Sequence, residues 1–96
     1  MKIETFAHKG LKRLYQKDDP KGVPPACRDK LRNMLGFLDS MADPAELKAP
    51  VLKWKAHELS GNRDGTWALH VTANQRLTFW VDDQRRLRDL NLEDYH

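Results

Sequence analysis

The chain has 96 residues, of which 40% are hydrophobic and 32% are charged, with a formal net charge of +3 at pH 7. This length suits one domain with a modest core, so we expect residues 1–96 to form a single domain. No apolar run approaches the roughly 20 residues that span a bilayer, and the N-terminus lacks the apolar block of a secretory signal, so we expect no membrane partner. A single cysteine, Cys27, excludes an internal disulfide and indicates a cytoplasmic protein.

The first elements expected along the chain are a short strand and a helix. The segment KIETFAH (residues 2–8) alternates in a way that is typical of a strand. From about His8 to Gln16, apolar residues recur at helical spacing, at Leu11, Leu14 and Tyr15. The segment KDDPKGVPP then ends this helix, because Asp, Pro and Gly favour turns.

A longer helix is expected from Pro24 or Pro25 to about Met41. Its apolar positions, which keep a 3.6-residue period, are Leu31, Met34, Leu35 and Leu38. Cys27 falls on the same face one turn earlier, so we expect it to fill the core. The sequence DPAE next predicts a helix of one or two turns, with Asp43 as N-cap and Glu46 completing a capping box, closed by Pro50.

From residue 52 onward, the hydrophobic period changes to two, which predicts strands. The four segments are LKWKAHEL (52–59), TWALHVT (66–72), QRLTFWVD (75–82) and RLRDLNLE (86–93). Short connections such as Ala73-Asn74 predict hairpins, so these strands should be antiparallel neighbours. The whole pattern predicts an α+β domain, with an N-terminal strand and two helices packed on a mainly antiparallel sheet of four to five strands.

Alternation along these strands separates their side chains into two faces. We expect the helices to cover the face that carries Leu77 and Phe79. The opposite face then displays Lys53, Lys55, His57, His70, Arg76 and Trp80. Cations interleaved with aromatic rings suit contact with a phosphate backbone and stacking on bases. A basic surface without a function would look similar, and for His70 a half-buried structural role is the preferred interpretation.

The chain ends in Asp94, Tyr95 and His96. Cleaving RNA without a metal requires a base for the 2′-hydroxyl, an acid for the departing 5′ oxygen and cations for the charge that develops. His57 and His96, with Arg76 as the cation, would meet these needs if the C-terminus folds back beside the segment 52–59. No HxH, CxxC or HExxH spacing is present, so we expect no metal and no other cofactor.

Three segments resemble HigB-type toxins, the plasmid-maintenance killer proteins of the RelE/ParE superfamily. They are FAHKGLKRLYQKD, HELSGNRDGTWALHVTANQRLTFWVDD and the terminal EDYH, and they follow the order of the family over nearly the whole chain. The resemblance implies a compact RelE-like fold and a bacterial toxin that enters the ribosomal A site and cleaves translated mRNA. It also implies a helix-turn-helix antitoxin of the HigA type as a partner. The toxin would contact operator DNA only through this antitoxin. The chain departs from the family at Ser60, where a lysine is common.

Together, the chemistry and the resemblance identify five candidate catalytic residues: His57, Arg76, Asp94, Tyr95 and His96. The candidate RNA-binding residues are Lys53, Lys55, Arg63, His70, Trp80 and Arg88. The expected activity is that of a metal-independent endoribonuclease acting on mRNA at the 70S ribosome. Two alternatives stay open: a ParE-like inhibitor of gyrase or the ribosome that does not cleave, and a weakly active toxin that acts mainly as corepressor with its antitoxin.

Overall fold

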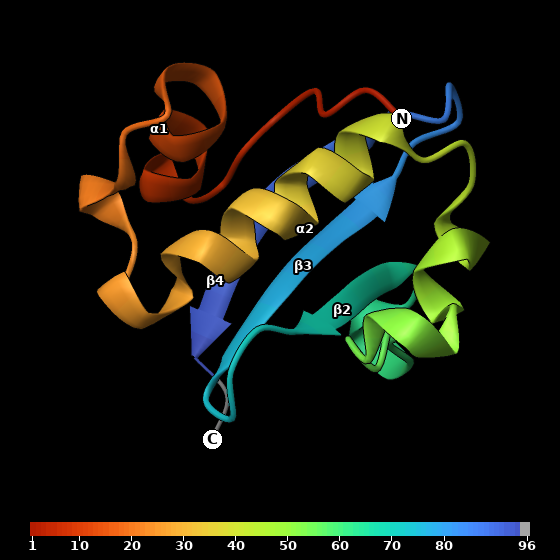
Figure 1. The fold of residues 1–96 in the computed structure, drawn as a ribbon. Helices are drawn as coiled ribbons and strands as arrows, with labels where there is room; N and C mark the ends of the chain where they lie inside the picture. Colours follow the sequence, from red (N-terminus) through yellow and green to blue (C-terminus); the bar gives the residue numbers. More distant parts are fainter. Residues whose placement is uncertain (95–96) are drawn as a thin grey trace.

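The computed structural model describes residues 1–94 (Figure 1). Two α-helices, α1 (Lys9–Lys17) and α2 (Arg28–Ser40), precede four strands: β1 (His57–Glu58), β2 (Thr66–His70), β3 (Gln75–Val81) and β4 (Leu87–Asp94). Short 3₁₀ turns form the connections at Pro20–Gly22, Pro25–Cys27, Pro44–Lys48, Pro50–Leu52 and Gly61–Arg63. None of the helices in this part of the chain is long and apolar enough to cross a membrane.

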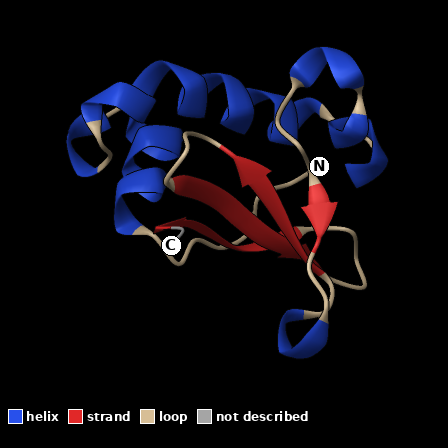
Figure 2. Cartoon of the chain, turned by 90° about the horizontal axis from the view of Figure 1, so that it is seen from below, coloured by secondary structure: helices blue, strands red, loops and turns tan. Residues whose placement is uncertain are grey.

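The strands form one antiparallel sheet in the order β1-β2-β3-β4. Helix α2 runs along one face of the sheet, in front of β3, and α1 lies on the same side (Figures 1 and 2). The apolar face of α2 (Leu31, Met34, Leu35 and Leu38) and the inward side chains of the sheet (Leu69, Leu77 and Phe79) are buried in one core. This confirms the predicted α+β architecture, and it leaves the other face of β2, β3 and β4 available for function.

The capping box predicted at DPAE is present. The Asp43 carboxylate accepts a hydrogen bond from the Ala45 backbone N–H at 2.8 Å, and the Glu46 carboxylate accepts from the Asp43 N–H at 2.9 Å. These two bonds satisfy backbone donors that the start of a helix otherwise leaves unpaired. A capping box depends only on neighbouring residues, so the sequence alone located it.

The predicted N-terminal strand is reduced to two isolated bridges. Ile3 pairs with Leu87 and Phe6 with Leu90, both in the parallel sense. Between these bridges Asp89 has a φ of 55°, in the left-handed region, which interrupts the extended backbone of β4. The N-terminal segment therefore runs along β4 without forming a continuous ladder with it.

The predicted strand over residues 52–59 was wrong for most of its length. Lys53 and Lys55 have φ values of 57° and 51°, which are incompatible with an extended strand, and only His57–Glu58 remains as β1. Trp54, between the two lysines, packs its ring edge-on against Phe37 at 5.4 Å and is buried. The alternation that placed Lys53 and Lys55 on the face of His57 therefore does not hold, because burial of Trp54 sets the local backbone.

The hairpin predicted between the segments 66–72 and 75–82 is confirmed, with a longer turn. Strand β2 ends at His70, and residues 71–74 connect it to β3. The Val71 N–H donates to the Gln75 carbonyl at 3.0 Å and closes the turn.

A β-bulge shifts the pairing of β3 with β4. Thr78 pairs with Asn91 and Trp80 with Arg88, so Asp89 and Leu90 together lie opposite Phe79. The extra residue lets both Leu87 and Leu90 point into the core, where each is fully buried, although they are three positions apart. The side chain of Arg88 consequently lies on the same face as Trp80.

Candidate active site

The antiparallel register aligns polar side chains in rows across the face that α2 leaves uncovered. One row contains His70, Arg76 and Glu93, since Arg76 is the partner of His70 on β2 and of Glu93 on β4. The next row contains His57 on β1, Ala68 on β2 and Thr78 on β3, since Ala68 pairs with both of the others. Because the side chain of Ala68 is small and its neighbours are longer, this face has a depression at Ala68.

These rows form the floor of a cleft of about 510 Å³. Its lining residues are His57, Leu59, Arg63, Ala68, His70, Arg76, Glu93 and Asp94. Five of the residues predicted from the sequence are thus brought together, namely His57, Arg63, His70, Arg76 and Asp94. The cleft joins segments from four strands and the Gly61–Arg63 turn, which no local pattern in the sequence connects.

Glu93 is the cleft residue that sequence reasoning missed. The Arg63 guanidinium donates two hydrogen bonds to its carboxylate, at 3.0 and 2.7 Å, and the buried Thr78 hydroxyl donates a third. The bonds from Arg63 lower the pKa of Glu93, and the same pair raises the pKa of Arg63. The sequence pattern could have identified Glu93. Alternation along the last strand directs Leu92 to the core and therefore places Glu93 on the face of Arg76.

Backbone carbonyls hold the Arg76 guanidinium at one end of the cleft. It donates to the carbonyl of Thr72 at 2.8 Å, to that of Gln75 at 3.1 Å and to that of Ala73 at 3.3 Å. These three bonds fix the position of the guanidinium group, whose planar set of donors suits a phosphate.

His57 lies exposed at the opposite side of the cleft floor. Its Nδ1 is 2.9 Å from the Lys55 carbonyl oxygen, which can only accept a hydrogen bond. This contact assigns the ring proton to Nδ1 in the neutral form, so Nε2 carries the lone pair. The arrangement gives His57 the tautomer that a general base requires at Nε2.

Several positively charged groups surround His70. Burial lowers its pKa first, and the positive charges of Arg76, Lys55, His57 and Lys30 lower it further. The ring therefore favours the neutral form at neutral pH. These contributions also show that Lys55 and Lys30 act on the cleft electrostatically, although neither lines it.

The remaining candidates are distributed around the cleft. Lys53 and Lys55 line a separate hollow of about 380 Å³ beside Lys48 and Trp54. Trp80 and Arg88 lie farther along β3 and β4, and Asp82 accepts a 2.9 Å hydrogen bond from Arg88. Asp94 closes the cleft at the end of β4, where Gln75 donates to its carboxylate. Tyr95 and His96 lie outside the described residues.

Within residues 1–94, no group of three or more His, Cys, Asp or Glu side chains is placed to hold a metal ion. The groups that the cleft does offer are two imidazole rings, positioned guanidinium groups and carboxylates. Such a set can move protons and stabilise a phosphate that gains negative charge.

Comparison with known proteins adds a family assignment. The model of the HigB-like toxin family, described as the RelE-like toxin HigB of type II toxin-antitoxin systems, matches residues 4–96. The chain is 38% identical over 95 residues to "Endoribonuclease HigB" of Proteus vulgaris, covering 98% of this chain and 99% of that one.

Two solved structures share the fold at low sequence identity. The YoeB/ParE toxin from Agrobacterium tumefaciens matches with a TM-score of 0.60 and 16% identity, over 100% of both chains. A chain of the heterotetrameric YoeB-YefM toxin-antitoxin complex from Staphylococcus aureus also matches. Its TM-score is 0.57 and its identity is 18%, over 100% of this chain and 99% of that one. These likenesses bear on the fold and confirm the RelE-like arrangement of helices and sheet.

Proposed function

Because the chain belongs to the HigB-like family of RelE-like toxins from type II toxin-antitoxin systems, we propose that it is an endoribonuclease that cleaves translated mRNA in the ribosomal A site. The relative in Proteus vulgaris that carries the name endoribonuclease aligns over nearly the full length of both chains, which supports this activity. The observation that carries the proposal is the cleft, which gathers His57, Arg63, His70 and Arg76 on the uncovered face of the sheet.

The proposed reaction moves two protons and needs no metal ion. His57 Nε2 takes the proton of a ribose 2′-hydroxyl, and the 2′ oxygen attacks the adjacent phosphorus. The bond from phosphorus to the 5′ oxygen breaks, and His96 protonates that oxygen, leaving a 2′,3′-cyclic phosphate and a 5′-hydroxyl. Asp94 and Tyr95 orient the tail, and Arg76 stabilises the extra negative charge on the phosphate.

The cations around the cleft are proposed to hold the RNA backbone. Arg63 is presented at the cleft edge by Glu93, and the charge of Lys55 reaches His70 inside the cleft. Lys53, in the neighbouring hollow, and Arg88, farther along β4, would add contacts to the backbone outside the cleft. Neutral His70 would accept or donate a hydrogen bond there without competing for the phosphate charge.

The proposed partners follow from the family. A type II toxin is held by an antitoxin, and we assign a helix-turn-helix antitoxin of the HigA type, with operator DNA contacted only through it. The ribosome and its mRNA are the proposed targets, in the cytoplasm. The Staphylococcus aureus complex contains a toxin and its antitoxin, which supports an antitoxin as a partner of this chain.

The test is induction of the wild-type protein and of His57→Gln in growing bacteria, followed by primer-extension mapping of mRNA ends. We expect growth arrest and cuts within translated codons for the wild type. His57→Gln should cut about 10²- to 10⁴-fold more slowly, because it removes the proton acceptor. Lys17→Ala, on the outer side of α1, is the matched control and should cut like the wild type.

Growth arrest with intact mRNA would contradict the proposal and favour an inhibitor that does not cleave. Unchanged growth, with operon repression only in the presence of the antitoxin, would favour the corepressor. Removing Tyr95 and His96 while the domain stays folded should abolish cutting, and full cutting by that variant would eliminate the tail from the mechanism.

A further inference from the structure

Trp80 is an exposed indole on the same sheet face as the cleft. Its side chain is 41% exposed, whereas Trp54 and Trp67 are only 9% and 8% exposed. Leu77 and Phe79, on the same strand, point into the core. Trp80 points to the opposite face of the sheet, outside that core. A large apolar ring left at the surface loses the stabilisation that burial provides, and tryptophan is enriched in the contact surfaces of proteins.

The ring of Trp80 is held in one orientation although it is exposed. Its Nε1–H donates a 2.7 Å hydrogen bond to the carboxylate of Asp89. Asp89 is the bulge residue with a φ of 55°, and its own N–H donates to the Thr5 hydroxyl at 2.8 Å. Contacts from the N-terminal segment and from β4 thus hold an indole on β3 that stays partly exposed.

The surroundings of Trp80 are suited to RNA. Arg88 lies directly opposite it in the register of β3 and β4, and its guanidinium is fixed by Asp82. Trp80 is four residues along β3 from Arg76, which corresponds to about 13 Å of strand. If an RNA strand places its scissile phosphate beside Arg76, the nucleotide at that phosphate is too far away to contact the indole. A nucleotide farther along the strand can reach it.

We propose that Trp80 is a stacking platform for an unpaired base of the RNA strand whose phosphate occupies the cleft, with Arg88 contacting the backbone next to that base. The inference rests on the proposed function, since it takes the substrate strand from it. Every base has a π-face, so stacking on an indole tolerates any sequence. The platform consequently fixes the position of the strand along the sheet and does not read its sequence.

The experiment measures binding of 2′-O-methyl RNA oligonucleotides of increasing length, which lack the attacking hydroxyl and are not cut. Wild type, Trp80→Leu and Trp80→Phe are compared by the quenching of tryptophan emission and by a fluorescence label on the RNA. Leucine matches the apolar character without a ring face, and phenylalanine restores one. Because Trp80 is exposed, these replacements leave the core intact, and circular dichroism checks the fold.

We expect Trp80→Leu to weaken binding of long oligonucleotides about five- to 100-fold and Trp80→Phe to recover most of the affinity. The difference should vanish for strands too short to span from Arg76 to Trp80. Asp89→Gly, which tolerates the positive φ but removes the anchoring carboxylate, should give an intermediate affinity. Wild-type RNA binding should also quench the emission of the exposed indole.

Equal affinity of Trp80→Leu and wild type at every length would overturn the platform, as would the absence of any RNA binding by the wild type. A loss that is the same for the shortest and longest strands would also overturn it, because it would place the effect in the cleft or the fold. The proposed function fails separately, if the wild type cuts no mRNA while long oligonucleotides still depend on Trp80.

Discussion

The two histidines of the cleft differ in what surrounds their ring nitrogens. His57 is exposed, and the Lys55 carbonyl fixes its tautomer from the Nδ1 side. His70 is half-buried, and burial with neighbouring cations favours its neutral form. A ring whose Nδ1 proton is fixed leaves Nε2 to accept a proton, whereas a neutral ring among cations is better suited to hydrogen bonding. The environment therefore assigns different roles to two residues that look equivalent in the sequence.

His8 is a helix cap that depends on its protonation state. Its Nδ1 accepts the Leu11 backbone N–H at 3.1 Å at the start of α1, and only an unprotonated nitrogen can do so. Burial lowers the pKa of His8 from 6.5. The folded state therefore binds fewer protons than the unfolded state, so the contribution of His8 is present above about pH 6.5 and is lost as the pH falls through the folded pKa.

We predict that the free energy of unfolding decreases between pH 7.5 and pH 5.5 by more in the wild type than in His8→Asn. Asparagine is a good N-cap that does not titrate, so this variant keeps the cap at both pH values. The difference should be about 0.5–2 kcal/mol, the usual range for losing an N-cap. Urea denaturation at the two pH values measures it, and parallel behaviour of the two proteins would exclude a capping role for the imidazole.

At the scale of elements, α1 and the Pro20–Gly22 turn meet through two glycines. A Cβ on Gly10 would lie 2.1 Å from the Gly22 carbonyl oxygen, and a Cβ on Gly22 would lie 2.5 Å from the Gly10 Cα. Both obstacles are backbone atoms, which cannot move as the end of a side chain can. The sequence predicted the turn from its proline and glycine, but it did not reveal that α1 rests on that turn.

We predict that Gly10→Ala destabilises the protein by about 1–3 kcal/mol, as expected when extra volume is forced into a packed contact. Gly36→Ala is the matched control, because Gly36 is also helical and a Cβ there would meet nothing within 4 Å. That substitution should stabilise the protein by about 0.5–1 kcal/mol through helix propensity. Thermal and urea unfolding of both variants give the comparison, and similar effects of the two substitutions would argue against the close contact.

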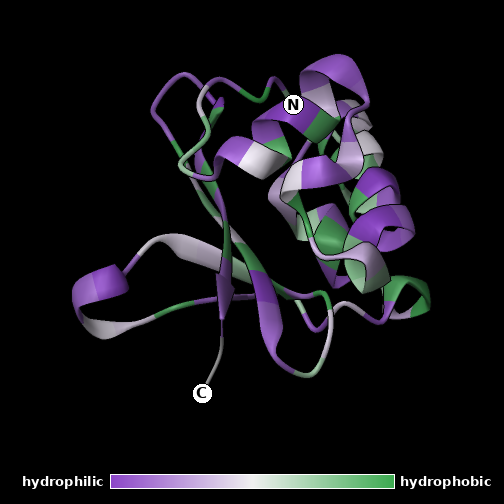
Figure 3. Ribbon diagram, turned by 90° about the vertical axis from the view of Figure 1, so that its left-hand side faces the viewer, coloured by the Kyte–Doolittle hydropathy of each residue, from purple (hydrophilic) through white to green (hydrophobic). Residues whose placement is uncertain are grey.

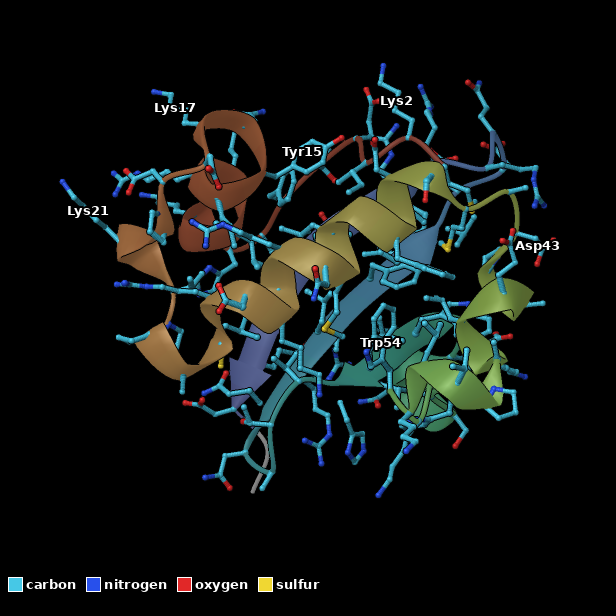
Figure 4. All side chains as sticks on the ribbon, viewed as in Figure 1. Lys2, Tyr15, Lys17, Lys21, Asp43 and Trp54 are labelled. Carbon is cyan, nitrogen blue, oxygen red and sulfur yellow. The ribbon has the colours of Figure 1, made fainter. Side chains whose placement is uncertain are left out.

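At the scale of the whole molecule, the helical layer and the cleft occupy opposite faces of one sheet. Figure 3 shows α1 and α2 on one side of the strands, and the cleft residues belong to the other face of the same strands. Lys17 and Lys21 project outward from the helical side (Figure 4). Their charges add to the net charge but lie away from the cleft, so we expect the position of a cation to decide whether it contacts RNA.

We predict that the affinity for single-stranded RNA falls with rising salt and that the slope identifies the cations in contact. Each phosphate contact contributes about −0.7 to the slope of log affinity against log salt concentration for a single strand. Lys55→Ala should therefore make the slope shallower by about 0.7, while Lys17→Ala leaves it unchanged. Fluorescence titrations at four salt concentrations measure the slopes, and equal slopes for both variants would show that net charge alone governs binding.

The sequence by itself determined the features that depend on neighbouring residues. Helix α2, the capping box at Asp43 and the strands β2, β3 and β4 follow from periodicity and local chemistry, because helices and hairpins satisfy their hydrogen bonds over short separations. Alternation also placed His70 and Arg76 on one face, since β2 and β3 are regular between these residues. The family resemblance rested on the same segments, and the comparisons confirm it.

Only the tertiary structure decided the features that depend on distant contacts. Burial of Trp54 against Phe37 forces Lys53 and Lys55 out of the extended conformation and shortens β1 to two residues. The bulge at Asp89 determines where Trp80 finds its hydrogen-bond partner. Arg63 and Glu93 are 30 residues apart and meet only because the sheet brings their segments together. Such contacts result from competition for one core, in which local propensity is outweighed by the packing of large side chains.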